Sequence, residues 1–313
     1  MDMGTFERLR PSFRSTSLVY LQGWGEPLLH PDLGSMIRQA KASGAMAGFT
    51  TNAILLDETR SLEMIRCGVD IVAVSLAGSR PATQERLRPG CDLARIDAAL
   101  GALNNLKRRH GAQNPRVHIA FLLLRSNWRE LGGVVDLAAR WKAAQIVVSQ
   151  MAWLGDPASQ AESLLPAPGL LPEISRALER AGEKASARGI GFCHHGAGAG
   201  RHRASCPENS LNACFVSHRG DVSPCVFTGF SLSPEARATH LFEGRTHNVR
   251  EFVFGNVREQ PLPVIWNSSR ARLFRQSFRN RAEEGGAGAA CLPEPCGRCY
   301  KLREPPEQPA GPL

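Results

Sequence analysis

What this 313-residue chain lacks narrows its class before any motif is considered. No apolar run approaches the ~20 residues that a membrane-spanning helix needs. The first ten residues include charged ones at positions 2, 7, 8 and 10, so the N-terminus does not resemble a secretion signal. We therefore expect a cytoplasmic protein with no membrane partner, long enough for one large domain or two medium ones.

Lysine and tyrosine are scarce, and this bears on the basic charge of the chain. Only five of the 38 basic residues are lysine, and Tyr20 and Tyr300 are the only tyrosines. The net charge of +9 comes from arginines spread along the whole chain, with no basic run interleaved with aromatic residues. This pattern is typical of an arginine-rich solvated surface rather than a nucleic-acid groove, so we expect no nucleic-acid partner.

Cysteine is absent from the first 66 residues, and most of the nine cysteines stand near the end of the chain. Cys67, Cys91 and Cys193 are scattered, and we expect them to be core thiols. The other six crowd the last third: Cys206, Cys214, Cys225, Cys291, Cys296 and Cys299. In a chain without a secretion signal, such a group predicts metal binding before disulfides.

The first half of the chain alternates apolar strand-like runs with amphipathic helix-like stretches. Expected strands cover residues 18–22, 45–51, 70–76, 117–124 and 145–150, and expected helices cover 32–43, 57–67, 92–110 and 127–142. Each helix begins at a residue that suits an N-cap, namely Asp32, Asp57, Asp92 or Asn127. This alternation predicts an α/β fold with a parallel sheet and helices outside it.

The second half of the chain is less regular. Residues 157–172 predict a loop, and a helix at 173–188 and a short strand at 189–193 follow. The glycine-rich stretch 194–200 predicts a linker into a cysteine-bearing module, whose main helix we expect at 262–280. Residues 285–290 predict a flexible connector. We therefore expect domains at 1–193 and 194–303, and a disordered, proline-rich tail at 304–313.

Three strand ends carry glycine or polar residues. The segment Gly23-Trp24-Gly25-Glu26-Pro27 follows the first expected strand, Thr51-Asn52 closes the second, and Ser75 lies at the end of the third. Each alone is typical of a turn, a cap or a strand end. Because ligands bind at the carboxyl ends of parallel strands, the three together predict one shared site for a small ligand, held partly by backbone groups.

The late cysteines have the pattern of a four-thiolate metal site. Cys296-x2-Cys299 is a ligand pair with Gly297 between its members, and Gly220 is placed to turn a hairpin that brings Cys214 and Cys225 together. These four cysteines are the expected ligands, with Cys206 as the first substitute and Cys291 as the second. On residue chemistry alone, a [4Fe–4S] cluster and a structural zinc ion are equally compatible with this set.

Residues 18–150 resemble the radical S-adenosylmethionine (SAM) core. The segment 23–27 corresponds to its Gly-Gly-Glu-Pro loop, Thr51-Asn52-Ala53 to its Thr-Asn-Gly segment, and Val74-Ser75-Leu76 with Glu85 and Arg88 to the stretch around the SAM ribose and carboxylate. The resemblance implies a partial (β/α)6 barrel that lacks its first strand. It also implies a SAM site at Gly23, Gly25, Glu26, Asn52, Ser75 and Arg88, in which the loop holds the methionyl amino group.

Residues 206–301 resemble a SPASM domain, the auxiliary-cluster module of many radical SAM enzymes. Its opening matches Cys206, Cys214 and 220–225, its middle matches 254–257 and 261–266, and its end matches 291–301. The resemblance favours an auxiliary [4Fe–4S] cluster over zinc, with the six late cysteines as its candidate ligands. The stretch from Ser223 to Trp266 is most similar to proteins that mature metalloenzymes or tungsten cofactors.

The two resemblances imply an enzyme that cleaves SAM reductively to a 5′-deoxyadenosyl radical. Its substrate would be a protein, a peptide or a metal cofactor, and its electron donor a ferredoxin or flavodoxin. The family's Cys-x3-Cys-x2-Cys loop for the SAM-cleaving cluster is missing before residue 23, so we expect an N-terminally truncated or misassigned chain that is inactive as given and carries that cluster only in a full-length form. The alternative is a non-catalytic iron–sulfur or zinc-binding remnant of such an enzyme.

Overall fold

The computed structural model describes residues 1–151, 153–164, 168–194, 206–230, 238–283 and 292–302. Cys291 and the expected connector and tail lie outside these residues, as does the expected linker apart from His194. Contacts divide the chain into two units: one comprises 10–149 and 173–194, the other 1–9, 150–172 and 195–313. The helices of the described residues include none that is both long and apolar enough to cross a membrane.

A six-stranded sheet forms the first unit, with its strands in sequence order. The strands are β1 (Leu18–Tyr20), β2 (Met46–Thr51), β3 (Ile71–Leu76), β4 (Arg116–Leu123), β5 (Gln145–Gln150) and β6 (Gly191–His194). The β1–β2, β2–β3, β3–β4 and β5–β6 ladders are parallel. The expected α/β fold and its six strands are therefore confirmed, and the sheet is curled into a partial barrel.

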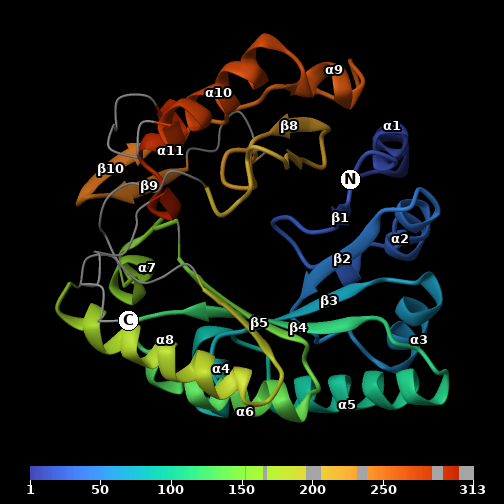
Figure 1. Cartoon of the computed structure of the whole chain (residues 1–313), viewed down its shortest axis with the longest axis vertical. Coiled ribbons are helices and arrows are strands. Elements are labelled where there is room, and N and C mark those ends of the chain that lie inside the picture. The colour runs from blue at the N-terminus through green and yellow to red at the C-terminus, as the bar shows by residue number, and fades with distance from the viewer. Residues whose placement is uncertain (152, 165–167, 195–205, 231–237, 284–291, 303–313) are drawn as a thin grey trace. The chain divides into compact units, whose positions relative to one another are not determined.

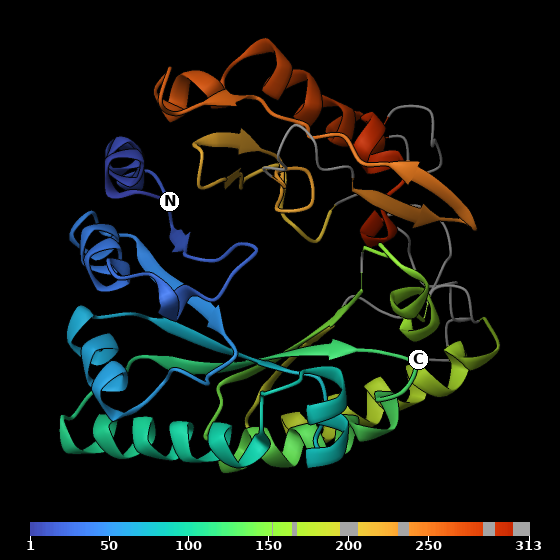
Figure 2. The ribbon, with the colours of Figure 1, turned by 180° about the vertical axis from the view of Figure 1, so that it is seen from behind.

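Helices cover one face of this sheet, and α5, α6 and α8 run along it in both views of the ribbon (Figures 1 and 2). The helices are α2 (Leu33–Ala42), α3 (Glu58–Cys67), α4 (Pro81–Leu87), α5 (Leu93–Arg109), α6 (Leu131–Arg140) and α8 (Leu171–Ser186). Side chains alternate between the faces of a strand. Val72, Val74 and Leu76 are accordingly inaccessible to solvent, whereas Ser75 lies on the opposite face and is half-buried.

Two of the four expected N-caps act as caps. Asp57 accepts a hydrogen bond from Arg60 N and Asp92 accepts one from Ala94 N, whereas Asp32 makes no capping bond. The expected helix at 127–142 begins as a 3-10 turn, η2 (Trp128–Glu130), and Asn127 does not cap it. The Asn127 side chain instead bonds backbone groups at the ends of β3 and β4, which a local sequence pattern cannot reveal.

Two further expectations are corrected. The expected loop at 157–172 contains the short helix α7 (Pro157–Glu162), which Asp156 starts through a capping box with Ser159, and a 3-10 turn, η3 (Pro168–Leu170). The single helix expected at 262–280 is two helices, α9 (Leu262–Trp266) and α10 (Ser269–Glu283).

The second unit holds small antiparallel sheets. Strands β7 (Phe215–Val216), β8 (Asp221–Ser223) and β11 (Gly255–Asn256) form one, and β9 (Thr239–Phe242) with β10 (Arg245–Asn248) forms another. Gly220 turns the β7–β8 hairpin at a φ of +91°, as expected. Helix α1 (Met3–Phe13) begins in this unit, where Asp2 Oδ2 lies 2.7 Å from Arg258 Nη2.

Candidate cofactor sites

The carboxylate of Glu26 fixes the glycine-rich loop after β1. Its Oε1 accepts hydrogen bonds from Thr51 Oγ1 at 2.7 Å and Leu28 N at 3.2 Å, and its Oε2 accepts one from Asn52 N at 2.9 Å. Bonds to an ionised acceptor are stronger than bonds between neutral groups. The ends of β1 and β2 are therefore joined by one side chain, which holds Gly23 and Gly25 in an exposed loop.

Asn52 contributes to the shape of the β2 end rather than to an open polar surface. Its Oδ1 accepts a hydrogen bond from Ile54 N at 2.9 Å, closing a short turn. Ala53, inside this turn, has a φ of +64°, in the left-handed region that favours glycine. The Thr-Asn-Ala departure from Thr-Asn-Gly thus keeps the backbone conformation at a cost in strain.

Three buried polar side chains hold the loop that follows β3 and Ser75. Gln84 Oε1 accepts bonds from Ala77 N and Gly78 N, and Asn127 Nδ2 donates to Ala77 O at 2.7 Å. Glu130 Oε2 accepts bonds from the backbone N–H groups of residues 79 and 80, at the N-terminus of α4. Sequence patterns did not predict these roles: Asn127 was expected only as a helix cap, and Gln84 and Glu130 carried no signal.

Arg88 carries a donor for an anionic ligand at the carboxyl ends of β1, β2 and β3, which together form the mouth of the sheet. Its Nε is buried and has no hydrogen-bond partner among the described residues. Burial lowers the pKa of Arg88, and the nearby Cys91 acts in the opposite direction. A guanidinium with an open donor suits a carboxylate, and Cys91 also lies within electrostatic range of Glu26, so the Arg88 region and the loop belong to one neighbourhood.

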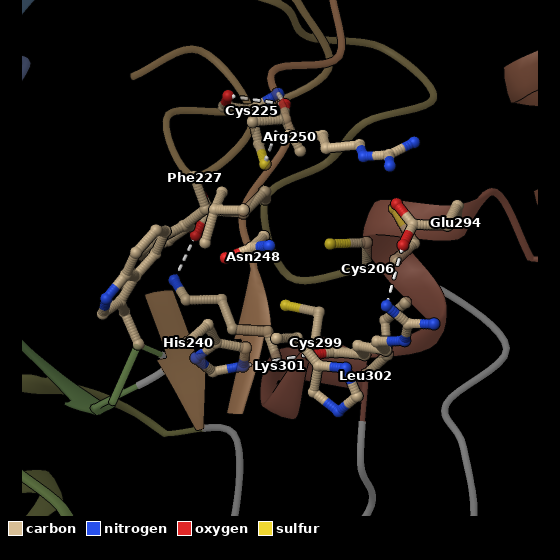
Figure 3. A pocket seen from close by; sticks show the side chains of 17 residues that line it. Cys206, Cys225, Phe227, His240, Asn248, Arg250, Glu294, Cys299, Lys301 and Leu302 are labelled. Carbon is tan, nitrogen blue, oxygen red and sulfur yellow. Dashed lines mark hydrogen bonds and ion pairs between the residues drawn. The ribbon is translucent and has the colours of Figure 1, made fainter. Parts of the chain in front are cut away.

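A cavity in the second unit gathers four of the late cysteines: Cys206, Cys225, Cys296 and Cys299. Figure 3 shows the sulfur atoms of Cys206, Cys225 and Cys299 directed toward the same space. Cys296 belongs to the short helix α11 (Glu294–Gly297), and Cys299 N donates to Cys296 O at 3.2 Å. Segments remote in sequence thus bring four thiols together.

The cavity strongly disfavours the thiolate form while it holds only protein. Burial, followed by smaller effects of neighbouring groups, raises the pKa of Cys206 to about 11 and that of Cys225 to about 12. The pKa of Cys299 is raised by burial, and that of Cys296 is raised by burial and by the other three thiols. Every pair among the four interacts electrostatically. A cationic group would reverse this penalty, since thiolates are metal ligands.

The four thiols surround a space rather than meet at a point. In the parts of the chain that the structure describes, no three His, Cys, Asp or Glu side chains form a group that could hold a single metal ion. A cubane cluster occupies more room than one ion and takes thiolates from several loops. The four thiols therefore suit an iron–sulfur cluster as ligands.

Cys214 lies outside this cavity, although it was among the four expected ligands. In the β7–β8 ladder Phe215 pairs with Ser223, so Cys214 continues the register opposite Pro224. Because side chains alternate between faces, Cys225 is then expected on the other face of the hairpin. Cys214 is instead near Arg275, a buried guanidinium stacked 3.9 Å from the Trp266 ring centroid.

Charged and polar side chains complete the cavity wall. Lys301 forms an ion pair with Glu208 and lies 4.8 Å from the Phe227 ring centroid. Thr228 Oγ1 is 3.7 Å from Cys225 Sγ. His240, Asn248 and Arg250 also line the space (Figure 3). None of these polar residues was predicted to line the site, although Lys301 lies in the segment 291–301 that resembles the end of the SPASM domain.

The fold and the two sites agree with comparisons to known families. Residues 10–138 match the radical SAM superfamily. Residues 206–300 match the SPASM domain, described as an iron–sulfur cluster-binding domain, so the chain combines a radical SAM match with a SPASM match.

Individual relatives cover most of the chain at low identity. A tungsten-containing aldehyde ferredoxin oxidoreductase cofactor-modifying protein of Pyrococcus furiosus is 25% identical over 86% of this chain and 72% of its own length. A PqqA peptide cyclase of Xanthomonas axonopodis pv. citri is 25% identical over 88% of this chain and 65% of its own length. The solved structure of native anSMEcpe with bound AdoMet and Cp18Cys peptide shares the fold, with a TM-score of 0.62 and 13% identity over 89% of this chain and 76% of that one.

Proposed function

We propose that this chain binds SAM at the mouth of its sheet and one [4Fe–4S] cluster in its cysteine cavity, as part of an enzyme that matures a metalloenzyme cofactor or a peptide. The observation that carries the proposal is the convergence of four buried thiols in one cavity, in a chain whose sheet presents an anchored glycine-rich loop. In this family, SAM and a reduced cluster supply one-electron cleavage chemistry.

At the SAM site each residue has a separate task. The backbone at Gly23, Gly25 and Glu26 receives the methionyl amino group, and the Glu26 carboxylate keeps that backbone in place. Ser75, half-buried on the face of the sheet away from the helices, and Arg88, with its open Nε, receive the carboxylate or ribose. Asn52 acts through the turn that it closes.

At the cluster site we propose Cys206, Cys225, Cys296 and Cys299 as the ligands, with Cys214 and Cys291 as substitutes. Their thiolates compensate part of the cluster's positive charge. A cytoplasmic location belongs to this proposal, because free thiols persist in a reducing compartment.

The sequence contains no Cys-x3-Cys-x2-Cys spacing, and we propose that these residues alone bind SAM without cleaving it. The substrate is a protein, a peptide or a metal cofactor, and the electron donor a ferredoxin or flavodoxin. A tungsten-cofactor-modifying protein and a peptide cyclase among the relatives support these two substrate classes. A non-catalytic iron–sulfur or zinc-binding role is the second candidate, favoured by the missing spacing.

Anaerobic purification of the chain, followed by metal analysis and SAM titration calorimetry, tests the proposal. About four irons per chain and saturable SAM binding are expected. Stoichiometric zinc without iron would contradict the cluster. Iron without SAM binding would leave only the non-catalytic role. An in-frame Cys-x3-Cys-x2-Cys upstream in the gene, with SAM cleavage by that longer form, would establish the enzyme.

A further inference from the structure

The β9–β10 hairpin presents a histidine to the cysteine segment 293–302. Its turn, Glu243-Gly244, has positive φ at both residues (+50° and +76°), the combination of a type I′ turn that gives a tightly twisted two-residue hairpin. Phe242 pairs with Arg245 and His240 with His247, so both histidines lie on the same face of the hairpin.

The two ring nitrogens of His240 have different partners. Leu154 N lies 3.3 Å from Nδ1, and because a backbone N–H can only donate, Nδ1 is the acceptor. The ring proton is therefore on Nε2, which lies 3.1 Å from the carbonyl oxygen of Arg298 and donates to it. Leu241 N also donates to Leu154 O at 2.8 Å, which fixes Leu154 against β9. The imidazole is thus held in one tautomer and one orientation.

Arg298 stands between two of the proposed ligands, Cys296 and Cys299. The segment makes several local hydrogen bonds of its own: Cys296 N and Gly297 N donate to Pro293 O, and Cys299 N donates to Cys296 O. Helix α11 has only four residues. The His240 bond to the Arg298 carbonyl therefore holds the second end of the Arg298–Cys299 peptide unit, whose N–H already bonds Cys296 O, and ties this short turn to the β9–β10 hairpin.

A second contact links the same hairpin to the same segment. Glu243 N donates to Tyr300 Oη at 2.8 Å, and the Phe242 and Tyr300 ring centroids are 4.8 Å apart. The His240 ring meets the edge of the Tyr300 ring, at a centroid distance of 5.8 Å. The residues on both sides of Cys299 are thus tied to one hairpin.

We propose that His240 is a positioning residue that fixes the Cys296–Cys299 ligand pair for the auxiliary cluster, with Tyr300 as the second tie. The inference rests on the proposed cluster site. Outer-shell hydrogen bonds that orient ligands commonly change metal affinity by about 10–100-fold when they are removed. Removing the His240 contact should accordingly weaken the cluster and alter its electronic environment.

The test uses the whole chain, reconstituted anaerobically with ferrous iron and sulfide. His240→Leu removes both ring contacts, and His240→Gln restores a donor near the Nε2 position. His218→Leu is the control, because His218 is exposed in the turn between β7 and β8 and does not line the cavity. Tyr300→Phe keeps the ring and removes only the acceptor oxygen. Iron per chain, the electron paramagnetic resonance (EPR) spectrum of the reduced protein and its midpoint potential are measured.

We expect His240→Leu to lose at least half of its iron and to show an altered EPR spectrum and midpoint potential in the remainder. His240→Gln should restore most of both, His218→Leu should match the wild type, and Tyr300→Phe should show the same spectral change to a smaller extent. The inference is overturned if His240→Leu matches the wild type in all three measurements, or if His218→Leu loses as much iron. If His240→Leu does not fold, wild-type behaviour of Tyr300→Phe overturns it. A wild-type chain without iron contradicts the proposed function itself.

Discussion

The mouth of the sheet and the cysteine cavity differ in whether interactions within the protein stabilise the groups that form the site. At the mouth, four side chains form hydrogen bonds that hold the loop backbone in place: those of Glu26, Gln84, Asn127 and Glu130. In the cavity, four thiols converge where burial and their mutual effects oppose ionisation. Protein groups alone therefore hold the loops at the mouth, whereas the buried thiols of the cavity would need a cationic group beside them to ionise.

The largest expected effect is the loss of iron when a cavity thiol is removed. Cys225→Ser and Cys299→Ser should reduce iron from about four per chain to less than one, because a serine hydroxyl is a poor cluster ligand. Cys193→Ser, on β6, is the control and should retain its iron. Cys214→Ser should also retain it; an equal loss in this variant would place Cys214 in the ligand set instead of one of the four cavity cysteines.

The next effect concerns the thiols of the iron-free chain. With a pKa of about 11, Cys206 is almost fully protonated at pH 8, so iodoacetamide should alkylate it at least about tenfold more slowly than a free cysteine thiol. The rate should rise as the pH approaches about 11, because deprotonation creates the nucleophile. Mass-spectrometric alkylation kinetics from pH 8 to pH 10 give the measurement, and rapid alkylation at pH 8 would contradict the burial of this thiol.

Substitution of Glu26 should weaken SAM binding while the glycines of the loop stay unchanged. Glu26→Ala removes three acceptor contacts and should raise the Kd for SAM by about 10–100-fold, the equivalent of about 1.5–3 kcal/mol for a charged hydrogen-bond network. Calorimetric titration with SAM measures this change. Glu58→Ala, an exposed glutamate on α3, is the control, and equal SAM affinity in all three proteins would show that the carboxylate does not shape the site.

Replacement of Asn127 should change the free energy of unfolding, because this side chain holds two of the loops at the mouth. Asn127→Leu leaves Ala77 O, Leu122 O and Leu124 N without their partner and should lower the free energy of unfolding by about 2–4 kcal/mol. Urea denaturation provides the measurement, with Asn105→Leu on the exposed face of α5 as the control. A change below about 1 kcal/mol would mean that water replaces the side chain at little cost.

The smallest effect is expected at Ala53. Its φ of +64° is unfavourable for alanine, so Ala53→Gly should stabilise the protein by up to about 1 kcal/mol, after the greater flexibility of glycine in the unfolded chain is included. Ala53→Val should instead destabilise it by more than about 1 kcal/mol, because a branched side chain suits this conformation less well. Thermal unfolding of the two variants compares the signs, and the same sign in both would contradict strain at this turn.

Periodicity and local motifs were sufficient for the strands of the parallel sheet and the position of the glycine-rich loop, whereas the partial barrel was implied only by the family resemblance. They were insufficient wherever a side chain acts on a distant element. Asn127 looked like a helix cap because caps are local, but its partners lie on β3 and β4. Cys214 looked like a partner of Cys225 because spacing shows the hairpin, whereas the β7–β8 register decides which face each thiol occupies. The role of His240 depends on a carbonyl 58 residues further along the chain.

Asn127 also has a consequence for how this protein opens. A single amide binds Ala77 O after β3 and both Leu122 O and Leu124 N at the end of β4. The turn at 77–80 and the turn at 124–127 therefore cannot loosen one after the other without leaving buried groups unpaired. The two turns should therefore form one cooperative unit in hydrogen exchange, with the amides of Ala77, Gly78 and Leu124 exchanging at a common rate. Release of the segment after Ser75 then has the energetic scale of a subglobal unfolding event rather than of a loop motion.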